Sequence, residues 1–209
     1  MISSAQLFLP LRSWYWDAGV AKTKNIGSLG GTATLGDGAT VGTFPTQLNP
    51  NGMSFDGGDY LDCGNVADYT DNFTLFCALS NTHLNASNLQ FFVRYNVTYQ
   101  YLLAYFGATG LPFFYDGATA VSGAKPVADG VFHTLASVVS GNQASVFVDG
   151  ELSGGPTAVA CATRVSNLSI GGIAGGLVGN IYIPQVYNFA LTPTQLRFLD
   201  SYARKFVSI

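Results

Sequence analysis

Charged residues are scarce in this sequence. Lysine, arginine, aspartate and glutamate together make up 10% of the 209 residues, against about 25% in an average soluble domain. The net charge is −3 and no basic run occurs, so no nucleic-acid partner is expected. No apolar run approaches the ~18 residues of a membrane-spanning helix, so no membrane insertion is expected. With so few charged residues, the surface of the protein is expected to be rich in Ser, Thr, Asn and Gly or to be covered by neighbouring molecules.

Cysteine is also scarce, and the three copies, Cys63, Cys77 and Cys161, are an odd number. The residues after Met1 lack the basic groups of a secretory signal, and the apolar stretch Leu7–Leu11 is too short for one. Free, buried thiols in a chain made in the cytoplasm are therefore favoured over a disulfide.

Several catalytic motifs are missing. The single glutamate, Glu151, leaves no E-x-D-x-x-E strand, whereas retaining glycosidases need two carboxylates about 5–5.5 Å apart. His83 and His133 are the only histidines, so composition leaves a Ser-His-Asp arrangement open, but His83 has no recognisable partner and no G-x-S-x-G, HExxH or CxxC sequence occurs. His133 is expected to pack within a sheet. We therefore expect the chain not to be an enzyme, with glycoside hydrolysis the least favoured function.

The most regular stretch of the sequence is residues 130–150. Apolar and polar residues alternate over 132–139 and again over 144–148, which predicts two strands, with Ser140–Asn142 as the turn between them. Asp149-Gly150 predicts a tight turn into a third strand, because type I′ turns need φ > 0 at both central residues. Two strands alone are marginal in water, so this hairpin predicts a larger sheet around it.

The remaining chain predicts more strands and one helix. Alternating aromatic residues over 89–106 indicate one long strand or a hairpin that turns near Asn96–Thr98. Near the C-terminus, Thr192-Pro193-Thr194-Gln195 has the pattern of a capping box. An apolar stripe follows it and predicts a helix over about residues 193–206.

Five segments resemble laminin G-like domains of the concanavalin A-like lectin/glucanase group. In the order of that family, they are residues 52–61 (GMSFDGGDYL), 72–75 (NFTL), 132–134 with 146–150 (FHT and VFVDG), 168–171 (LSIG) and 179–191 (GNIYIPQVYNFAL). The resemblance implies an all-β fold, a two-sheet antiparallel β-sandwich of the jelly-roll type, here with a C-terminal α-helix. Residues 1–209 are interpreted as one such domain.

Two tryptophans are candidates for ligand binding. Trp14 and Trp16 lie close together in the sequence and predict an aromatic platform for a sugar ring. The alternative is that they pack at the edge of the sandwich or against a neighbouring subunit, which is the favoured interpretation.

Two aspartates are candidates for metal binding. Asp56 and Asp59 lie on the segment that resembles the family's F-D-G-x-D sequence, and the resemblance implies a possible calcium ion there, although no cofactor is required. Where the family has further acids, this chain has Tyr182 and Ile183. The favoured alternative is that both aspartates stabilise their own turns.

Two functions follow from these observations. The first is a non-enzymatic virion structural protein, such as a phage capsid decoration, fibre or tail component, whose partners are other virion proteins, a homo-oligomer of itself and host surface glycans. The second is a soluble carbohydrate-binding or adhesion module without a viral role. The expected locations are accordingly the virion, or the extracellular space reached by a non-classical route.

Overall fold

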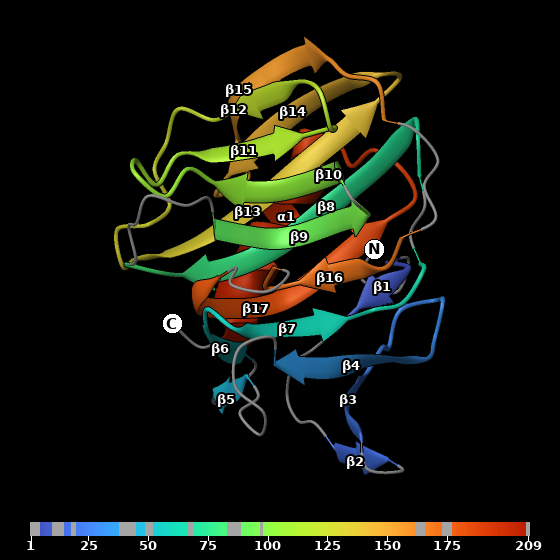
Figure 1. Cartoon of the computed structure of the whole chain (residues 1–209). Helices are drawn as coiled ribbons and strands as arrows, with labels where there is room; N and C mark the ends of the chain where they lie inside the picture. The colour runs from blue at the N-terminus through green and yellow to red at the C-terminus, as the bar shows by residue number, and fades with distance from the viewer. Residues whose placement is uncertain are drawn as a thin grey trace.

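The chain forms two antiparallel β-sheets that pack face to face, with one helix on the outside (Figure 1). The structure is a computed structural model, and it describes residues 5–9, 15–17, 20–37, 45–48, 52–66, 69–82, 89–96, 98–161, 166–172 and 177–207. Within these residues the fold is the all-β sandwich with a C-terminal helix that the sequence predicts. That residues 1–209 form a single domain stays a prediction.

One sheet, sheet A, carries the helix. In spatial order its strands are β15 (Glu151–Ala158), β14 (Gln143–Val148), β13 (Phe132–Ser140), β8 (Asn72–Ser80), β17 (Val178–Tyr187), β6 (Gly52–Asp56) and β5 (Thr46–Leu48), and β1 (Leu7–Phe8) also pairs with β17. The hairpin expected over residues 130–150 is therefore confirmed as β13 and β14. Its turn into β15 has the positive φ angles that were expected, 54° at Asp149 and 76° at Gly150.

The other sheet, sheet B, faces it. In spatial order its strands are β12 (Ala120–Ser122), β11 (Pro112–Tyr115), β10 (Thr98–Tyr105), β9 (Leu89–Asn96), β16 (Leu168–Ile170), β7 (Asp59–Asp62), β4 (Thr32–Asp37), β3 (Val20–Lys24) and β2 (Tyr15–Asp17). The aromatic stretch over residues 89–106 thus forms two paired strands, as the hairpin interpretation expected. The sequence also predicts a short strand near residues 41–44, which lie outside the described residues.

The core lies between the two sheets, because strands present alternate residues to it. Leu75, Cys77 and Leu79 of β8 face inward and are fully buried, whereas Phe76 and Ala78 face the helix. All three cysteines are free and buried, as expected. Burial raises the pKa of the Cys161 thiol to about 12, with smaller contributions from nearby carboxylates. These thiols are part of the packing.

Helix α1 (Pro193–Val207) covers the outer face of sheet A. Its N-terminus is the capping box that the sequence predicts: Gln195 N donates to Thr192 Oγ1 (3.3 Å), and Thr192 N donates to Gln195 Oε1 (2.8 Å). Leu196, Leu199 and Ala203 face the sheet and are buried. The helix thereby closes a second apolar layer over β13, β8 and β17.

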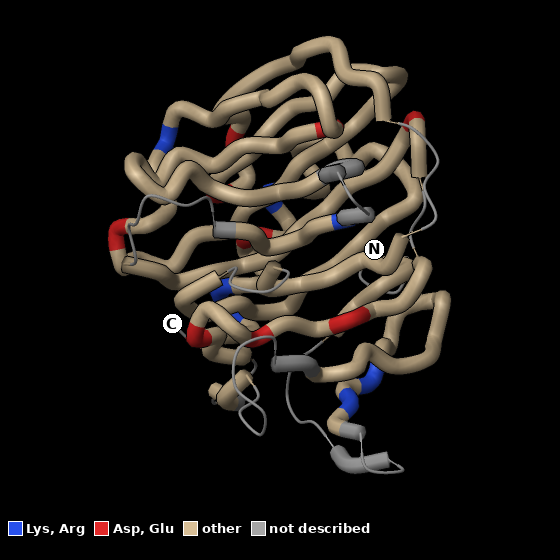
Figure 2. The backbone as a smooth tube through the Cα atoms, in the orientation of Figure 1, with Lys and Arg blue, Asp and Glu red and all other residues tan. Residues whose placement is uncertain are grey.

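Charged residues are few, and most of the tube in Figure 2 has the colour of uncharged residues. No helix in the described part of the chain is long and apolar enough to cross a membrane.

Candidate functional site

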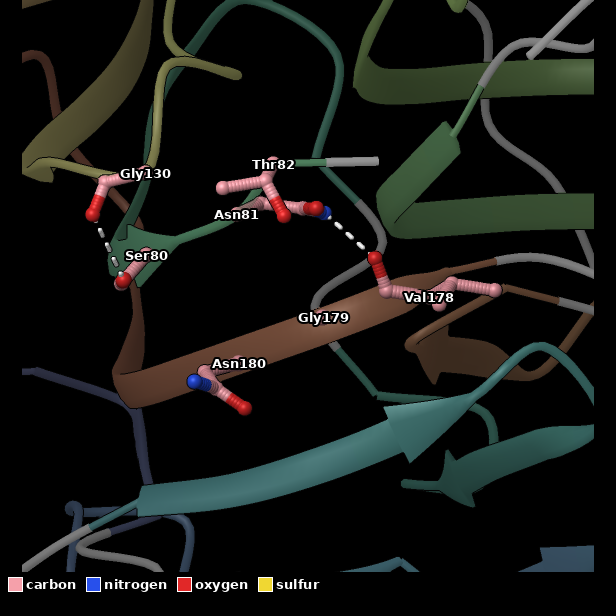
Figure 3. A pocket seen from close by; sticks show the side chains of 7 residues that line it. All are labelled: Ser80, Asn81, Thr82, Gly130, Val178, Gly179 and Asn180. Atoms are coloured by element: carbon pink, nitrogen blue, oxygen red, sulfur yellow. Dashed lines mark hydrogen bonds between the residues drawn. The ribbon is translucent and has the colours of Figure 1, made fainter. Parts of the chain in front are cut away.

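A polar pocket lies at the end of the sandwich where β8 ends and β17 begins (Figure 3). Its volume is about 330 Å³, at the small end of the ~300–1,000 Å³ that is typical of ligand sites. We call it the rim pocket. It is lined by Ser80, Asn81, Thr82, Gly130, Val178, Gly179 and Asn180.

Three chain segments meet at the rim pocket, and hydrogen bonds hold them together. Asn81 Nδ2 donates to the Val178 carbonyl at 2.6 Å, which joins the end of β8 to the start of β17. Gly130 N donates to the Asn81 carbonyl at 2.8 Å and brings in the segment that precedes β13. Asn81 is buried, so its side chain maintains the shape of the pocket.

Glycine is required at position 179 for this close approach. The φ angle of Gly179 is 145°, a value that L-residues rarely adopt. A Cβ atom there would lie 2.3 Å from Asn81 Nδ2. The bare backbone therefore allows the Asn81 amide to reach the neighbouring carbonyl.

The pocket offers uncharged hydrogen-bonding groups. Ser80 and Thr82 present hydroxyls, and Asn180 presents an amide that hydrogen-bonds with Tyr182. A hydroxyl donates one hydrogen bond and accepts others, and an amide has two donors and an acceptor oxygen. Such a lining matches a ligand with many hydroxyl groups.

The two aspartates that the sequence singles out lie beside the rim pocket. Asp56 is the β-sheet partner of Val178. Asp59 Oδ2 accepts a hydrogen bond from Asp56 N (3.0 Å), and Asp56 Oδ1 accepts one from Gly58 N (3.0 Å). Both carboxylates therefore stabilise their own turn. No group of three or more His, Cys, Asp or Glu side chains within the described residues is placed to hold a metal. Calcium binding stays a prediction.

The two tryptophans are not assigned to the rim pocket. Trp14 lies outside the described residues. Trp16 lies on β2 at the edge of sheet B, paired with Ala21, and its side chain is outside the described part. Their role as a sugar platform stays a prediction.

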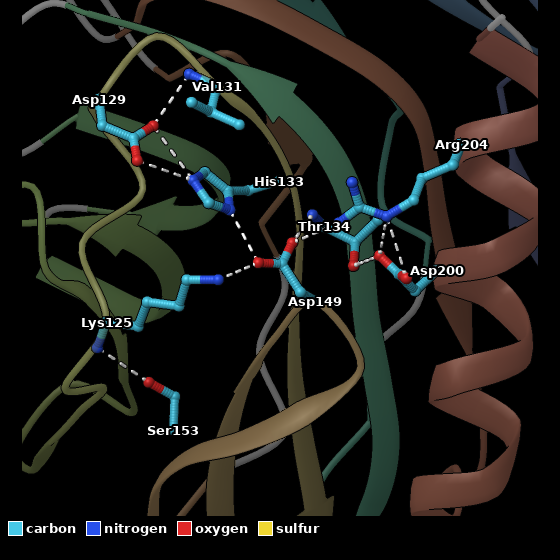
Figure 4. A network of polar contacts seen from close by, with 9 residues as sticks. All are labelled: Lys125, Asp129, Val131, His133, Thr134, Asp149, Ser153, Asp200 and Arg204. Atoms are coloured by element: carbon cyan, nitrogen blue, oxygen red, sulfur yellow. Dashed lines mark hydrogen bonds and ion pairs between the residues drawn. The ribbon is translucent and has the colours of Figure 1, made fainter. Parts of the chain in front are cut away.

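A second polar feature lies next to the pocket and centres on Asp149 (Figure 4). Asp149 Oδ2 lies 2.9 Å from His133 Nδ1 and also pairs with Lys125. Asp149 Oδ1 accepts hydrogen bonds from Thr134 N (3.1 Å) and from Arg204 of α1 (2.9 Å). These contacts join the β14–β15 turn to β13 and to the helix.

Two further carboxylates complete this Asp149 network. His133 Nε2 lies 3.1 Å from Asp129 Oδ1. Asp200 accepts from Thr134 Oγ1 (2.8 Å) and from Arg204 Nε (3.1 Å). Each charge in the network faces an opposite charge, so the network is suited to fix α1 and the hairpin in place.

The network shifts the titration of His133 and Asp149. The hydrogen bond with Asp149 raises the pKa of His133, and Asp129 adds to the effect against the opposing influence of burial. Burial alone would raise the pKa of Asp149, but hydrogen bonds from His133 and Lys125 outweigh it and hold that pKa well below its usual range. His133 thus packs within the sheet, as expected, and also forms an ion pair when protonated.

Sequence reasoning missed the residues of the rim pocket. Ser80, Asn81 and Thr82 form a short polar run directly after the apolar strand β8, and that change of polarity is the available signal. Asn180 follows a glycine in the segment 179–191, which was interpreted for its family resemblance and as a strand but not as part of a ligand site.

The fold is that of lectin- and glucanase-like sandwiches. A laminin G-type sequence profile, described as the concanavalin A-like lectin/glucanases superfamily, matches residues 55–197, more than half of the chain. The chain belongs to this superfamily. A comparison with curated proteins found no significant match.

Several solved structures share the sandwich. Domain 4 of an extracellular GH43 arabinanase from Geobacillus stearothermophilus, in complex with arabinotriose, is 17% identical with a TM-score of 0.61, and the match covers 82% of each chain. Trypanosoma rangeli sialidase in complex with sialic acid is 18% identical with a TM-score of 0.68; the match covers 97% of this chain and 33% of the sialidase. The binding domain of botulinum neurotoxin DC in complex with SialylT is 10% identical with a TM-score of 0.65, over 97% and 52% of the two chains.

These similarities correct one expectation. The prediction that the chain is not an enzyme is contradicted, because the structures it resembles include an arabinanase domain and sialidases. The prediction rested on the absence of local catalytic motifs, among them the E-x-D-x-x-E strand of retaining glycosidases. That absence tests only local arrangements, whereas a fold brings together carboxylates from separate strands that no local motif records.

Proposed function

We propose that the chain is a carbohydrate-binding domain that holds a glycan in the rim pocket. The observation that carries the proposal is an uncharged, hydroxyl- and amide-lined pocket at the strand ends of a lectin/glucanase-type sandwich. Ligand contacts are commonly made by such loop and strand-end residues on a rigid scaffold.

Three side chains are assigned to ligand contact. Ser80 Oγ donates a long hydrogen bond of 3.4 Å to the Gly130 carbonyl, which a sugar hydroxyl can replace. Thr82 is exposed at the mouth of the pocket. Asn180 is partly exposed and is held by Tyr182, which leaves its remaining amide groups for a sugar. Asn81 positions the backbone.

The test is titration calorimetry of the whole chain against a panel of oligosaccharides that includes arabinotriose. Saturable binding is expected. One net hydrogen bond is worth about 0.5–1.5 kcal/mol, so Ser80→Ala and Asn180→Ala should each weaken binding roughly three- to tenfold. Thr157→Ala, an exposed position on edge strand β15, is the matched control and should leave the affinity unchanged.

Two results would contradict the proposal: no binding to any glycan of the panel, or binding that both pocket variants leave unchanged while they melt at the native temperature. The same samples are incubated and analysed for released sugars. Product release by the native chain would extend the proposed function from binding to hydrolysis.

The more specific role in a virion stays a prediction, as do the homo-oligomer, the virion partners and the location of the protein. Neither the family nor the similar structures indicate a phage role. Sizing the protein in its source material tests this role, because a virion component would elute with large particles.

A further inference from the structure

The described lining of the rim pocket offers no cation to an acidic sugar, because none of its seven residues carries a charge. In the sequence, residues 84–88 and 173–176 also contain no lysine or arginine, and His83, which follows Thr82, lies outside the described residues. Recognition of a carboxylate typically uses the two parallel donors of an arginine or the charge of a lysine.

Two carboxylates flank the pocket instead. Asp129 directly precedes the lining residue Gly130, and its side chain is 48% exposed. Asp56 is exposed and pairs with the lining residue Val178 across the sheet. Neighbouring Cα atoms are separated by about 3.8 Å along the chain and by about 4.5–5.5 Å across antiparallel strands. The backbones of both acidic residues therefore lie within a Debye length of about 8 Å of the pocket lining.

The lysine and arginine of the adjacent Asp149 network already form ion pairs with carboxylates of that network. Lys125 pairs with Asp149, and Arg204 binds both Asp149 and Asp200. Arg204 also lies over the ring of Phe132, 5.5 Å from its centre. Hydrogen bonds from Val131 N and from His133 lower the pKa of Asp129 against the effect of burial, so this carboxylate is ionised at neutral pH. His133 offsets the charge of Asp129 when His133 is protonated, and Asp129 carries an unopposed charge when His133 is neutral.

We infer that the rim pocket selects neutral glycans over glycans that carry a carboxylate, such as sialylated ones. The inference deepens the proposed function and rests on it. Among the similar structures, one is in complex with the neutral arabinotriose and another with the acidic sialic acid. The match covers only 33% of the sialidase, so the similarity does not decide between the two ligand chemistries. The charges around this pocket favour the neutral one.

The experiment compares matched ligands on the whole chain. Titration calorimetry measures the affinity for lactose, for a neutral lactose-based trisaccharide and for 3′-sialyllactose, with arabinotriose and trigalacturonic acid as a second pair. The acidic ligands are expected to bind about tenfold more weakly than neutral ligands of the same length. The difference should narrow between 50 mM and 500 mM salt, because screening weakens the repulsion.

Two variants place the same charge at different positions. Asn180→Lys adds a cation to the pocket and should raise the affinity for 3′-sialyllactose relative to the neutral trisaccharide by about tenfold. Thr157→Lys adds it to edge strand β15 and should leave that ratio unchanged. The two variants have the same net charge, so non-specific attraction cannot account for a difference between them.

The outcomes separate the inference from the proposed function. Equal or tighter binding of the acidic ligand by the native chain, or an equal response of the ratio in both variants, overturns the inference and leaves glycan binding in place. Failure to bind any ligand of either class overturns both. Preferential binding of the neutral ligands, with the ratio altered only in Asn180→Lys, supports both.

Discussion

Replacing Asp149 with asparagine tests the role of the Asp149 network in stability. Asparagine keeps the size of the side chain and tolerates the left-handed backbone at this position, where φ is 54°. The change therefore removes the charge without straining the turn. It weakens the contacts with His133, Lys125 and Arg204 together.

The expected loss in the free energy of unfolding depends on how well each contact of Asp149 is shielded from water. The His133 side chain is only 5% exposed, and hydrogen bonds to charged groups contribute about 1.5–3 kcal/mol. Lys125 and Arg204 are 53% and 41% exposed, so solvent screening limits their pairs to at most about 1 kcal/mol in total. Asp149→Asn is expected to lower the free energy of unfolding by about 3 kcal/mol at pH 5.5.

The effect depends on pH in a definite direction. The pKa of His133 is raised above its ordinary value of 6.5, so its ion pairs contribute fully below about pH 6.5 and are lost as pH rises through the raised pKa. The pKa of Asp149 is lowered, so its contribution is complete above about pH 4 and is lost only in stronger acid. The native protein should lose stability from pH 6 to pH 9, and the variant should lose less.

Urea unfolding followed by tryptophan fluorescence at pH 5.5, 7 and 9 measures both effects, and NMR titration of His133 gives its pKa directly. Asp129→Asn is the control, because the Asp129 side chain is 48% exposed and should contribute less than about 1 kcal/mol. The reasoning is refuted if Asp149→Asn is within about 0.5 kcal/mol of the native protein at pH 5.5, or if it keeps the whole pH dependence.

Two further predictions concern the helix cap and the rim. Thr192→Ala removes the Oγ1 acceptor for Gln195 N and should cost about 1 kcal/mol in urea unfolding, whereas a change below about 0.3 kcal/mol would show that the cap is not needed. Gly179→Ala should cost about 3 kcal/mol, because it combines an unfavourable φ with a clash against Asn81. Gly64→Ala also places a side chain at a positive φ, but its Cβ would have no atom within 4 Å, so it should cost only about 1–2 kcal/mol. If both variants lower the melting temperature equally, the proposed clash at position 179 is contradicted.

The parts of the fold that the sequence predicts are those with strong local signals. The alternation over β13 and β14, the turn residues Asp149-Gly150 and the capping box at Thr192 each act within a few residues, and all three are present in the structure. The strands at the beginning of the chain were harder to predict from the sequence. The alternation of Leu7, Leu9 and Leu11 predicts one strand within residues 5–16. In the structure β1 pairs in sheet A, whereas β2 pairs in sheet B. The choice of sheet depends on distant partners.

The candidate site depends on pairings of this long-range kind. Ser80 meets Asn180 only because β8 and β17 are neighbours, although they are far apart in the sequence. Serine, threonine and asparagine at the end of a strand are also common in ordinary turns, so their chemistry does not distinguish a ligand site from a loop. Asp56 and Asp59 were singled out for calcium and lie beside the pocket, but their oxygens accept hydrogen bonds within their own turn.

The segment Asp129–Thr134 links part of the sequence that resembles the family to one edge of the rim pocket. His133 and Thr134 belong to the sequence that resembles the family, and their contacts with Asp149 fix the start of β13. Asp129, bound to His133, fixes the residue before Gly130, and Gly130 forms one edge of the pocket. Residues that carry the family resemblance therefore set the position of the pocket edge, and the resembling segment 179–191 also contributes Gly179 and Asn180 to the lining. Backbone geometry requires glycine at position 179, but it does not require the polar side chains of Ser80, Thr82 and Asn180, so these three residues are where the ligand preference of this pocket is set.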